Sequence, residues 1–233
     1  MKVNTELQHG HLQIVTTADG SNTIFNAQVG ENYHSRHGAL QESKHVFIDT
    51  GLLYYLQQRA GTEASVSVLE VGFGTGLNFL LSADACTQQK AALSYTGIEA
   101  YPLGVEMISQ TGYNQYVPSA LWESFLNIYT SSLNSSVQLN PYISLEVAAC
   151  KLMDYDTDRQ FDVIYFDAFA AIHQPEMWDD EAIAHTLKFL KPGGVFVTYA
   201  ITGNLKRSIK ALGLQVQKVP GAPGKREMLR ALR

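Results

Sequence analysis

The sequence predicts an α/β fold, a doubly wound and mostly parallel sheet of seven strands with an N-terminal β-hairpin extension. The first observation is that apolar strand patterns alternate with helical patterns from residue 65 onward. This alternation is typical of a parallel sheet covered by helices on both faces. The second is the segment LEVGFGTGLNFLL (69–81), in which a buried strand leads through three glycines into an apolar helix. Sheets of this kind bind ligands at the carboxyl ends of their strands, where this turn lies.

The elements follow in chain order from the same patterns. The extension is expected to span residues 1–60 and the main domain residues 61–233. Strands are predicted at residues 66–71, 93–98, 142–148, 161–167, 193–200, 214–219 and 226–231. Helices are predicted at residues 76–88, 103–111, 119–132, 178–190 and 203–212. The segment LKPGG (190–194) separates a helix from a strand because Pro and Gly interrupt both.

The extension has two parts. Two alternating apolar runs flank Asp19-Gly20 within residues 11–30, which is a hairpin signal. Residues 42–61 read as a helix, or as a loop and a helix, closed by Gly61.

Composition predicts a folded protein of a reducing compartment. Hydrophobic residues make up 45% of the 233 residues and charged residues 17%, which suits a packed core and not a disordered chain. The N-terminus has no signal-peptide core, and no run reaches the roughly 18 apolar residues of a membrane span. The two cysteines, Cys86 and Cys150, form no CxxC pattern. We therefore expect a cytoplasmic protein with no membrane association, no disulfide framework and no metal site.

Gly72, Gly74 and Gly76 stand at every second position of the turn, which indicates close approach of a ligand to the backbone. A dinucleotide fingerprint, G-x-G-x-x-G, would need glycine where Leu77 stands. The observed spacing favours a cofactor without a pyrophosphate, with a nearby acid for its ammonium group, and Glu70 is the candidate acid. The alternative is a turn that serves only tight helix–strand packing.

Two further carboxylates follow predicted strands at the same edge of the sheet. Glu99 ends the second strand, where it can accept hydrogen bonds from both ribose hydroxyls of an adenosine. Its alternative role is a charge at the start of the next helix. Asp167 follows the buried run VIYF and is the best candidate for a catalytic carboxylate. Asp162, at the opposite end of that strand, reads as a surface or turn residue.

The loop after Asp167 supplies candidate substrate contacts. Phe169 and Trp178 are aromatic residues that can receive a base, and His173 lies between them in the sequence. The alternatives are a core position for Trp178 and a satisfied polar position for His173.

Charge is divided unevenly along the chain. Residues 1–200 contain nine Lys and Arg against 21 Asp and Glu, whereas residues 201–233 contain eight Lys and Arg against a single acid, Glu227. Such a division can mark a face for a polyanion, and the alternative is a solvated basic helix and strand. The candidate cations for this face are Lys206, Arg207, Lys210, Lys225 and Arg226.

Four motifs resemble one protein family when they are taken together. They are GALQESKHVFIDTGL (38–52), EVGFGTGLNFL (70–80), DAFAAIHQPEMW (167–178) and GKREML (224–229). In this order they are similar to the MnmC-type methyltransferases, which comprise the methyltransferase domain of the bifunctional tRNA 5-methylaminomethyl-2-thiouridine biosynthesis protein and its stand-alone counterparts. The resemblance covers residues from about 33 to 233.

The resemblance implies a Rossmann-like class I fold, S-adenosyl-L-methionine as cofactor, and tRNA as partner through its anticodon region. It implies methyl transfer to the aminomethyl nitrogen of the wobble uridine, with Asp167 accepting an N–H bond and the released proton. The residues expected at the cofactor are Glu70, Gly72, Gly74, Gly76, Asn78, Glu99 and Asp167. The residues expected in catalysis are Asp167 and Phe169, and those expected at tRNA are His173, Trp178, Lys206, Arg207, Lys225 and Arg226.

A flavin oxidase domain follows in the bifunctional form of the family. No second glycine fingerprint is present in this sequence, so no flavin is expected, and a separate flavin oxidase is a candidate partner.

The sequence departs from the family pattern at three places. The family usually has Asp-Gly-Phe-Ala-Pro at the fourth strand, where this chain has DAFAA (167–171). Where the family frequently has a Lys-Asn pair, this chain has His173-Gln174. Where the family often has a Gly-Asp pair that holds the adenine amino group, this chain has Ala149-Cys150. The residue that contacts adenine is therefore not assigned.

Three other functions fit parts of the sequence. A small-molecule methyltransferase or an aminopropyl-transferring polyamine synthase would not need the basic segment 201–233. A nicotinamide oxidoreductase is disfavoured by Leu77 in the glycine turn. A noncatalytic RNA-binding module with an adenosine pocket would bind the cofactor without turnover.

Overall fold

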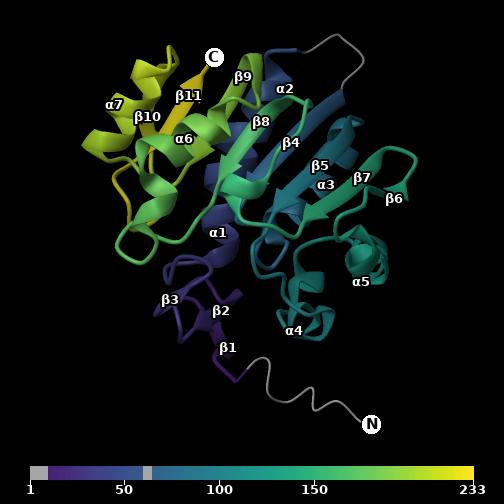
Figure 1. Ribbon diagram of the computed structural model, residues 1–233. Coiled ribbons are helices and arrows are strands. Elements are labelled where there is room, and N and C mark those ends of the chain that lie inside the picture. The colour runs from purple at the N-terminus through teal and green to yellow at the C-terminus, as the bar shows by residue number, and fades with distance from the viewer. Residues whose placement is uncertain (1–9, 60–64) are drawn as a thin grey trace.

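The computed structural model describes residues 10–59 and 65–233. Gly61 and the expected boundary between the extension and the main domain lie outside the described residues. The described chain forms a small antiparallel sheet and a large mixed sheet. Figure 1 shows the small sheet below the large one.

The large sheet has eight strands in the order β10-β11-β9-β8-β4-β5-β7-β6. Its strands are β4 (Ser65–Val71), β5 (Ala92–Ile98), β6 (Val137–Asn140), β7 (Ile143–Ala148), β8 (Phe161–Phe166), β9 (Leu190–Thr198), β10 (Gln215–Pro220) and β11 (Glu227–Leu232). The five central strands, from β9 to β7, are parallel, and the outer pairs are antiparallel. The chain leaves β4 first toward β5 and later returns beside it as β8, which makes a topological switch point at the carboxyl ends of these strands.

The α/β class with a mostly parallel sheet is confirmed, but the count of seven strands is wrong. The additional strand is β6, which pairs antiparallel with β7 through a turn at Asn140. The Asn140 side-chain oxygen accepts the N–H groups of Tyr142 and Ile143 at 2.9 and 3.0 Å. Sequence reasoning missed β6 because this edge strand alternates only between half-buried and exposed positions.

The N-terminal extension is a three-stranded sheet and not a two-stranded hairpin alone. Strands β1 (Leu12–Thr16) and β2 (Asn22–Asn26) pair antiparallel, and the short β3 (Glu31–Asn32) adds to β2. The loop between β1 and β2 is tied to the following helix, because Asp19 accepts the backbone N–H of Gln41 at 3.0 Å. The small sheet lies at the carboxyl edge of the large sheet (Figure 1).

A continuous helical segment connects the two sheets. It consists of α1 (Ala39–Ser43), the π-helical η2 (Lys44–Leu53) and α2 (Tyr54–Gln57), so it begins three residues before the predicted start at residue 42. It packs closely on the sheet at Gly51, where an added Cβ would lie 2.9 Å from Val197.

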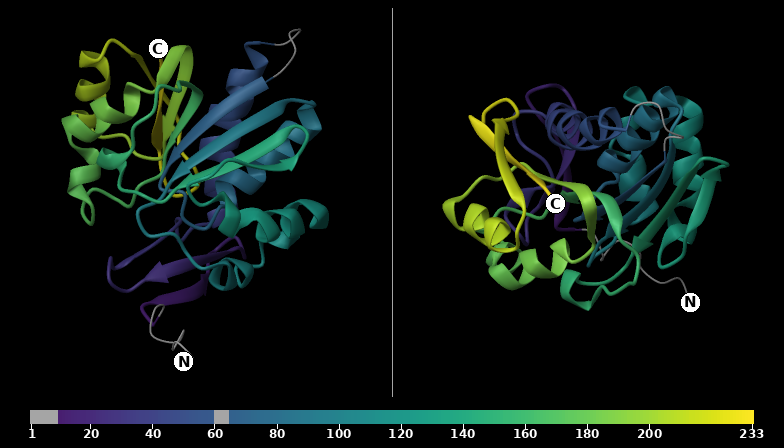
Figure 2. Two further views of the ribbon diagram at one scale, coloured as in Figure 1. Left: turned by 45° about the vertical axis from the view of Figure 1, so that its right-hand side comes forward. Right: turned by 90° about the horizontal axis from the view of Figure 1, so that it is seen from above.

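The remaining helices cover both faces of the large sheet, as Figure 2 shows from above. They are α3 (Leu77–Gln89), α4 (Val105–Ser109), η3 (Tyr113–Gln115), α5 (Ser119–Ser132), η4 (Leu152–Asp154), η5 (Pro175–Trp178), α6 (Asp180–Leu187) and α7 (Gly203–Ala211). One apolar core contains η2, α3 and α5 side chains, and a second contains α6 and α7 side chains. None of the described helices is both long and apolar enough to span a bilayer.

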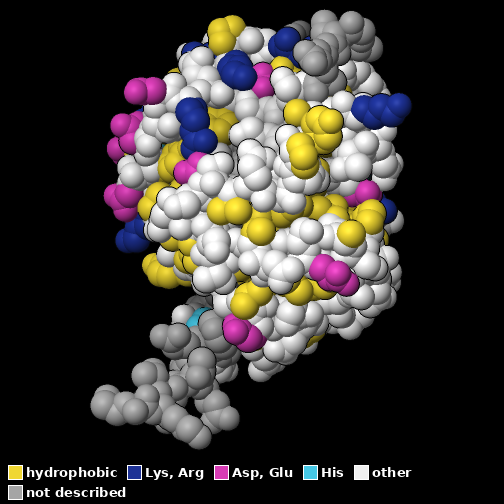
Figure 3. All heavy atoms as spheres, turned by 90° about the vertical axis from the view of Figure 1, so that its right-hand side faces the viewer, with side chains coloured by type: hydrophobic (Ala, Val, Ile, Leu, Met, Phe, Trp, Pro, Cys, Tyr) yellow, Lys and Arg dark blue, Asp and Glu magenta, His cyan; other side chains and the backbone are white. Residues whose placement is uncertain are grey.

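The face that carries α4, α5 and β6 has few basic groups. Residues 91–150 contain no Lys or Arg, and Figure 3 shows only scattered Lys and Arg side chains on this side of the molecule.

Asp162 is not the surface or turn residue that was predicted. Its carboxylate is buried at the amino end of β8, where it accepts hydrogen bonds from the Tyr55 hydroxyl and the Ser67 hydroxyl, both at 2.6 Å. Lys191 adds an ion pair at 2.9 Å. The prediction was wrong because α2 and the start of β9 cover this end of the sheet, which the local sequence does not show.

Candidate active site

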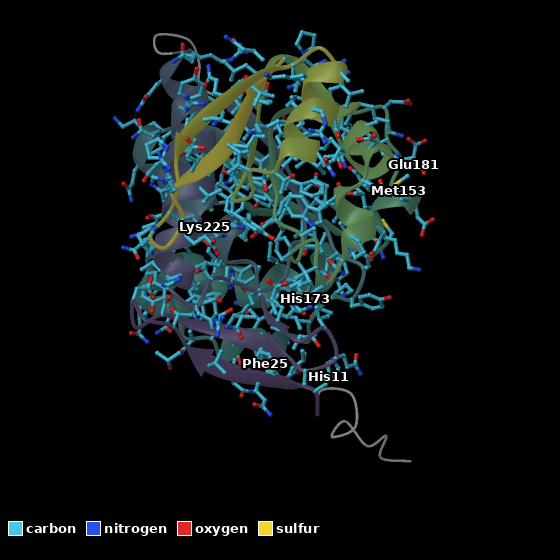
Figure 4. The ribbon with its side chains drawn as sticks, turned by 90° about the vertical axis from the view of Figure 1, so that its left-hand side faces the viewer. His11, Phe25, Met153, His173, Glu181 and Lys225 are labelled. Atoms are coloured by element: carbon cyan, nitrogen blue, oxygen red, sulfur yellow. The ribbon has the colours of Figure 1, made fainter. Side chains whose placement is uncertain are left out.

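Two cavities meet at the carboxyl edge of the large sheet. The first has a volume of about 1060 Å³ and the second about 500 Å³. In Figure 4 the labelled residues of the second cavity (Phe25, His173, Lys225) lie to the left of their counterparts in the first (His11, Met153, Glu181). Five residues line both cavities and form what we call the junction: Tyr33, His34, Asp167, Ala168 and Phe169.

The glycine turn forms the floor of the first cavity, and all three of its glycines have positive φ, from 53° to 87°. An added Cβ on Gly72 would lie 2.5 Å from the Asp167 carbonyl oxygen, and one on Gly74 would lie 2.9 Å from the Tyr33 ring. An added Cβ on Gly76 would lie 2.7 Å from the Phe125 ring, and Gly76 does not line the cavity. The glycines are therefore required by backbone conformation and by neighbouring protein atoms, while Gly72 and Gly74 also present bare backbone to the cavity.

Glu99 lines the first cavity and is held by the backbone around it. Its two carboxylate oxygens accept the N–H groups of Gly74 at 2.9 Å and Tyr101 at 3.0 Å. Burial raises its pKa, and these N–H bonds oppose the rise. The bonds orient both oxygens and leave each a further lone pair for a ligand hydroxyl.

Asn78 joins two carboxylates behind the cavity floor. Its amide nitrogen donates to Glu70 at 2.7 Å and to Asp167 at 2.9 Å. The other Glu70 oxygen accepts the Tyr95 hydroxyl at 2.8 Å, and Glu70 does not line either cavity. The Asn78 side-chain oxygen is buried and has no hydrogen-bond partner within the described part of the chain, although Asn78 lines the first cavity. A buried acceptor of this kind normally has a donor, which a ligand can supply.

Asp167 lies at the junction, and the pKa of its side chain is strongly raised. Burial raises the pKa of its carboxyl to about 8, and the nearby Glu42 adds to the rise. Asn78 and Lys225 act in the opposite direction. The Asp167 carboxyl therefore exchanges a proton close to neutral pH, as a general base requires.

The second cavity is closed by the N-terminal extension. Tyr33 and Phe169 stand edge to face across the junction, with ring centroids 5.1 Å apart. Glu31 accepts the backbone N–H of Ala170 at 2.9 Å, which ties β3 to the loop after β8. Aromatic rings and carboxylates thus share the walls of this cavity.

Lys225 also lines the second cavity, but its ammonium group has partners in the protein. It lies 2.8 Å from the Glu42 carboxylate, whose side chain is 8% exposed, and 3.9 Å from the centroid of the Tyr199 ring. Arg226 is exposed, so the cation that pairs with an internal acid is Lys225 and not Arg226.

The other predicted substrate residues lie apart. His173 is exposed and lines the second cavity. Trp178 lines neither cavity; its indole N–H donates to the Phe169 carbonyl at 2.7 Å, and its ring packs on Phe166. Trp178 is thus half-buried and packs against the core that contains α6 and α7 side chains.

The basic residues of α7 line neither cavity. Lys206 is half-buried, and Arg207 and Lys210 are exposed. None of the three forms an ion pair within residues 10–59 and 65–233. No group of three His, Cys, Asp or Glu side chains in those ranges is placed to hold a metal ion.

A family model described as S-adenosyl-L-methionine-dependent methyltransferase matches residues 114–233. This match covers slightly more than half of the chain. The chain belongs to this family. It is therefore a methyltransferase that uses S-adenosyl-L-methionine.

This methyltransferase is similar to proteins named tRNA 5-methylaminomethyl-2-thiouridine biosynthesis bifunctional protein MnmC. It is 30% identical over 226 residues to one from Leptospira interrogans, covering 89% of this chain and 33% of that protein. It is 28% identical over 213 residues to one from Pseudomonas savastanoi pv. phaseolicola, covering 85% and 31%. The chain spans about a third of the length of these curated relatives.

Solved structures support the fold of the methyltransferase. MnmC2 from Aquifex aeolicus has a TM-score of 0.76 at 22% identity, covering 97% of this chain and 71% of that one. Spermidine synthase from Thermotoga maritima has a TM-score of 0.56 at 14% identity, covering 95% and 68%.

Sequence reasoning missed the contribution of the extension to the site of the methyltransferase. Tyr33, His34 and Glu42 line the second cavity, and the first two also line the first cavity. Glu42 lies within the motif GALQESKHVFIDTGL, which was used only as a mark of resemblance. No local signal shows that these residues fold over the carboxyl edge of a sheet formed by later strands.

Proposed function

We propose that this methyltransferase transfers a methyl group from S-adenosyl-L-methionine to the aminomethyl nitrogen of 5-aminomethyl-2-thiouridine at the wobble position of tRNA. The names of its relatives support this substrate. The observation that carries the proposal is the position of Asp167, which lies at the junction of a cofactor-sized cavity and a smaller one and has its pKa raised to about 8.

The first cavity offers groups that fit S-adenosyl-L-methionine. The unpartnered Asn78 oxygen is an acceptor for an ammonium group, and the Asp167 carboxyl lies beside it as a second oxygen acceptor. The oriented Glu99 oxygens are acceptors for two ribose hydroxyls. Cys150 and Asp154, which follow β7 and line the same cavity, are the candidates for contact with adenine. Glu70 contributes only indirectly, by holding Asn78.

When bound, S-adenosyl-L-methionine supplies a methyl group on a positively charged sulfur. The protein has to hold the acceptor nitrogen in line with that methyl group and to exclude water. Asp167 accepts an N–H bond from the amine at the junction, and the amine reaches it through the second cavity. A nitrogen–carbon bond forms while the sulfur–carbon bond breaks, and Asp167 takes up the proton that the amine loses. Phe169 and Tyr33 shape the passage between the cavities.

The tRNA backbone is proposed to lie against the basic residues near the C-terminus. Lys206, Arg207, Lys210 and Arg226 have no ion pair within the described part of the chain, so their charges are available to phosphates. The opposite face, with α4 and α5, has few such groups. His173 at the rim of the second cavity is proposed to contact the anticodon region.

A partner and a location belong to the same proposal. The relatives are named bifunctional, and the family resemblance implies a separate flavin oxidase as the partner. A cytoplasmic location follows from a tRNA substrate.

The direct test is an assay of product identity. Purified protein is incubated with labelled S-adenosyl-L-methionine and tRNA from cells that lack this modification, and the tRNA is digested to nucleosides. We expect label in 5-methylaminomethyl-2-thiouridine, and none when putrescine or another small amine replaces tRNA. Methyl label only in the small amine would refute the tRNA proposal in favour of a small-molecule methyltransferase.

A further inference from the structure

His34 lies at the junction, yet the methyl transfer described above does not use it. It belongs to the loop between β3 and α1, and it is one of the residues that line both cavities. Its Nδ1 lies 2.9 Å from the hydroxyl of Thr23, a fully buried residue of β2. The same hydroxyl oxygen accepts the backbone N–H of His34 at 3.2 Å.

These contacts determine which imidazole nitrogen carries the hydrogen. The Thr23 hydroxyl hydrogen has no acceptor other than His34 Nδ1 within the described part of the chain. Because a buried hydroxyl hydrogen needs an acceptor, Thr23 donates to Nδ1, and the hydrogen of the neutral ring is on Nε2. Burial lowers the pKa of His34 to about 4 despite Glu42 and Asp19 nearby, so the ring is neutral at physiological pH.

His34 Nε2 has no hydrogen-bond partner within residues 10–59 and 65–233. A single, uncharged N–H donor is therefore presented where the two cavities meet. The second cavity also has aromatic walls, which are formed by Tyr33, Phe169 and Phe25. Aromatic walls with one donor suit a planar ring that has an exocyclic acceptor.

We infer that His34 Nε2–H donates a hydrogen bond to the 4-carbonyl oxygen of the wobble uracil ring and thereby selects uracil. The inference rests on the proposed function. The aminomethyl nitrogen has to lie beside Asp167, and one methylene carbon joins it to ring carbon 5. The neighbouring ring carbon carries the 4-carbonyl, so a donor at the same junction meets this oxygen, whereas the 2-position lies on the far side of the ring.

This contact distinguishes uracil from cytosine. Cytosine has an amino group at position 4, which would set one N–H donor against another and leave both without an acceptor. Selection by an unmatched donor pair is an effective way to reject an analogue of the same shape.

The test uses two synthetic anticodon stem-loops, which carry 5-aminomethyl-2-thiouridine or 5-aminomethylcytidine at the wobble position. Three variants are compared with the parent: His34→Asn, His34→Gln and, as a control, His45→Gln. The amide of asparagine occupies the position of His34 Nδ1 and does not extend to that of Nε2. The amide of glutamine occupies the position of Nε2, where it can donate through its N–H or accept through its oxygen. His45 bonds to the Pro220 carbonyl and lines neither cavity.

We expect the parent and the control to favour the uridine stem-loop in kcat/KM by about 100-fold or more. The Asn variant should lose about 10- to 100-fold on uridine, with S-adenosyl-L-methionine affinity unchanged within twofold. The Gln variant should recover most of the uridine activity and reduce the preference over cytidine at least tenfold. A merely structural role of His34 would lower both substrates equally and would not distinguish Asn from Gln.

Two results would overturn the inference while leaving the proposed function intact. One is a parent that methylates both stem-loops equally well. The other is a folded Asn variant with uridine kcat/KM within twofold of the parent. A parent that binds S-adenosyl-L-methionine but methylates neither stem-loop, nor native tRNA lacking the modification, would overturn the proposed function and the inference with it.

Discussion

Lys225 Nζ lies 2.8 Å from Glu42 Oε1, so the turn before β11 is joined to α1 across the second cavity. The second Glu42 oxygen accepts the backbone N–H of Ser35 at 2.8 Å. This one carboxylate therefore connects the C-terminal hairpin, the helical segment and the loop that carries the junction residues. Other basic residues of the C-terminal segment also have partners in the fold: Arg230 bonds to the Thr50 carbonyl, Arg233 to the Leu187 and Leu190 carbonyls, and Lys218 pairs with Glu227. Arg207, Lys210 and Arg226 are instead exposed and form no ion pair within the described part of the chain.

Replacing Lys225 by Met is expected to lower the free energy of unfolding by about 1–3 kcal/mol, because Glu42 then remains as a buried and unpaired carboxylate. Arg226→Ala should change it by no more than about 0.5 kcal/mol. The double variant Lys225→Met with Glu42→Gln should recover part of the loss. Urea unfolding curves measure all three, and equal stability of the Lys225 variant and the parent would contradict a structural role for the ion pair.

Removing the α7 cations is expected to weaken tRNA binding and its dependence on salt. Each phosphate contact contributes a log–log slope of roughly −0.9 on a duplex segment. The triple variant Lys206→Ala, Arg207→Ala, Lys210→Ala should therefore bind tRNA less tightly with a flatter slope, while S-adenosyl-L-methionine affinity stays the same. Filter binding from 50 to 300 mM salt (about the range in which such slopes are measured) tests this. The control is Lys90→Ala, an exposed cation after the last turn of α3. A triple variant with the parent's slope would exclude α7 from the RNA face.

Asp167→Asn is expected to reduce methyl transfer by about 10²-fold or more while cofactor binding survives, because the variant keeps the shape but cannot take up the proton. In the parent, the single-turnover rate should rise with pH through about 8, where the Asp167 carboxyl loses its proton. This limb should be missing from the pH profile of the variant. A variant that matches the parent's rate would remove Asp167 from catalysis.

The same substitution is expected to stabilise the fold in a pH-dependent way. The pKa of Asp167 is raised to about 8 in the folded protein, from an ordinary value of 3.8. Between these two pH values the unfolded chain is ionised while the folded carboxyl holds its proton, so the parent loses stability as pH rises. Asn does not titrate, and the variant should gain about 1–3 kcal/mol over the parent at pH 8 but little at pH 4. Thermal melting across this range measures the difference, and a constant difference would be inconsistent with the raised pKa.

Glu99→Ala is expected to cost about 1–3 kcal/mol in S-adenosyl-L-methionine affinity, since two hydroxyl donors would lose their acceptors. Gly74→Val should abolish binding, because a side chain there meets the Tyr33 ring and the backbone has φ +53°. Glu106→Ala, an exposed carboxylate of α4, is the control. Calorimetry showing parent-like affinity for both site variants would separate this turn from the cofactor.

The sequence by itself determined the class of the fold and the family. Alternation of strand and helix patterns is a local property of the chain, and it placed five parallel strands and the glycine turn correctly to within a few residues. It also placed Gly72, Glu99 and Asp167 at strand ends, which in a parallel sheet lie at one edge. All three line the first cavity.

Only the tertiary structure decided what surrounds those residues. The extension folds back over the carboxyl edge, so that Tyr33, His34 and Glu42 meet Asp167 from positions more than a hundred residues away in the chain. Burial and neighbouring charge then set the acidity of Asp167, and the buried Glu42 carboxylate draws Lys225 out of the basic surface. Such effects depend on distances between segments that are remote in sequence, and no pattern within a segment encodes those distances.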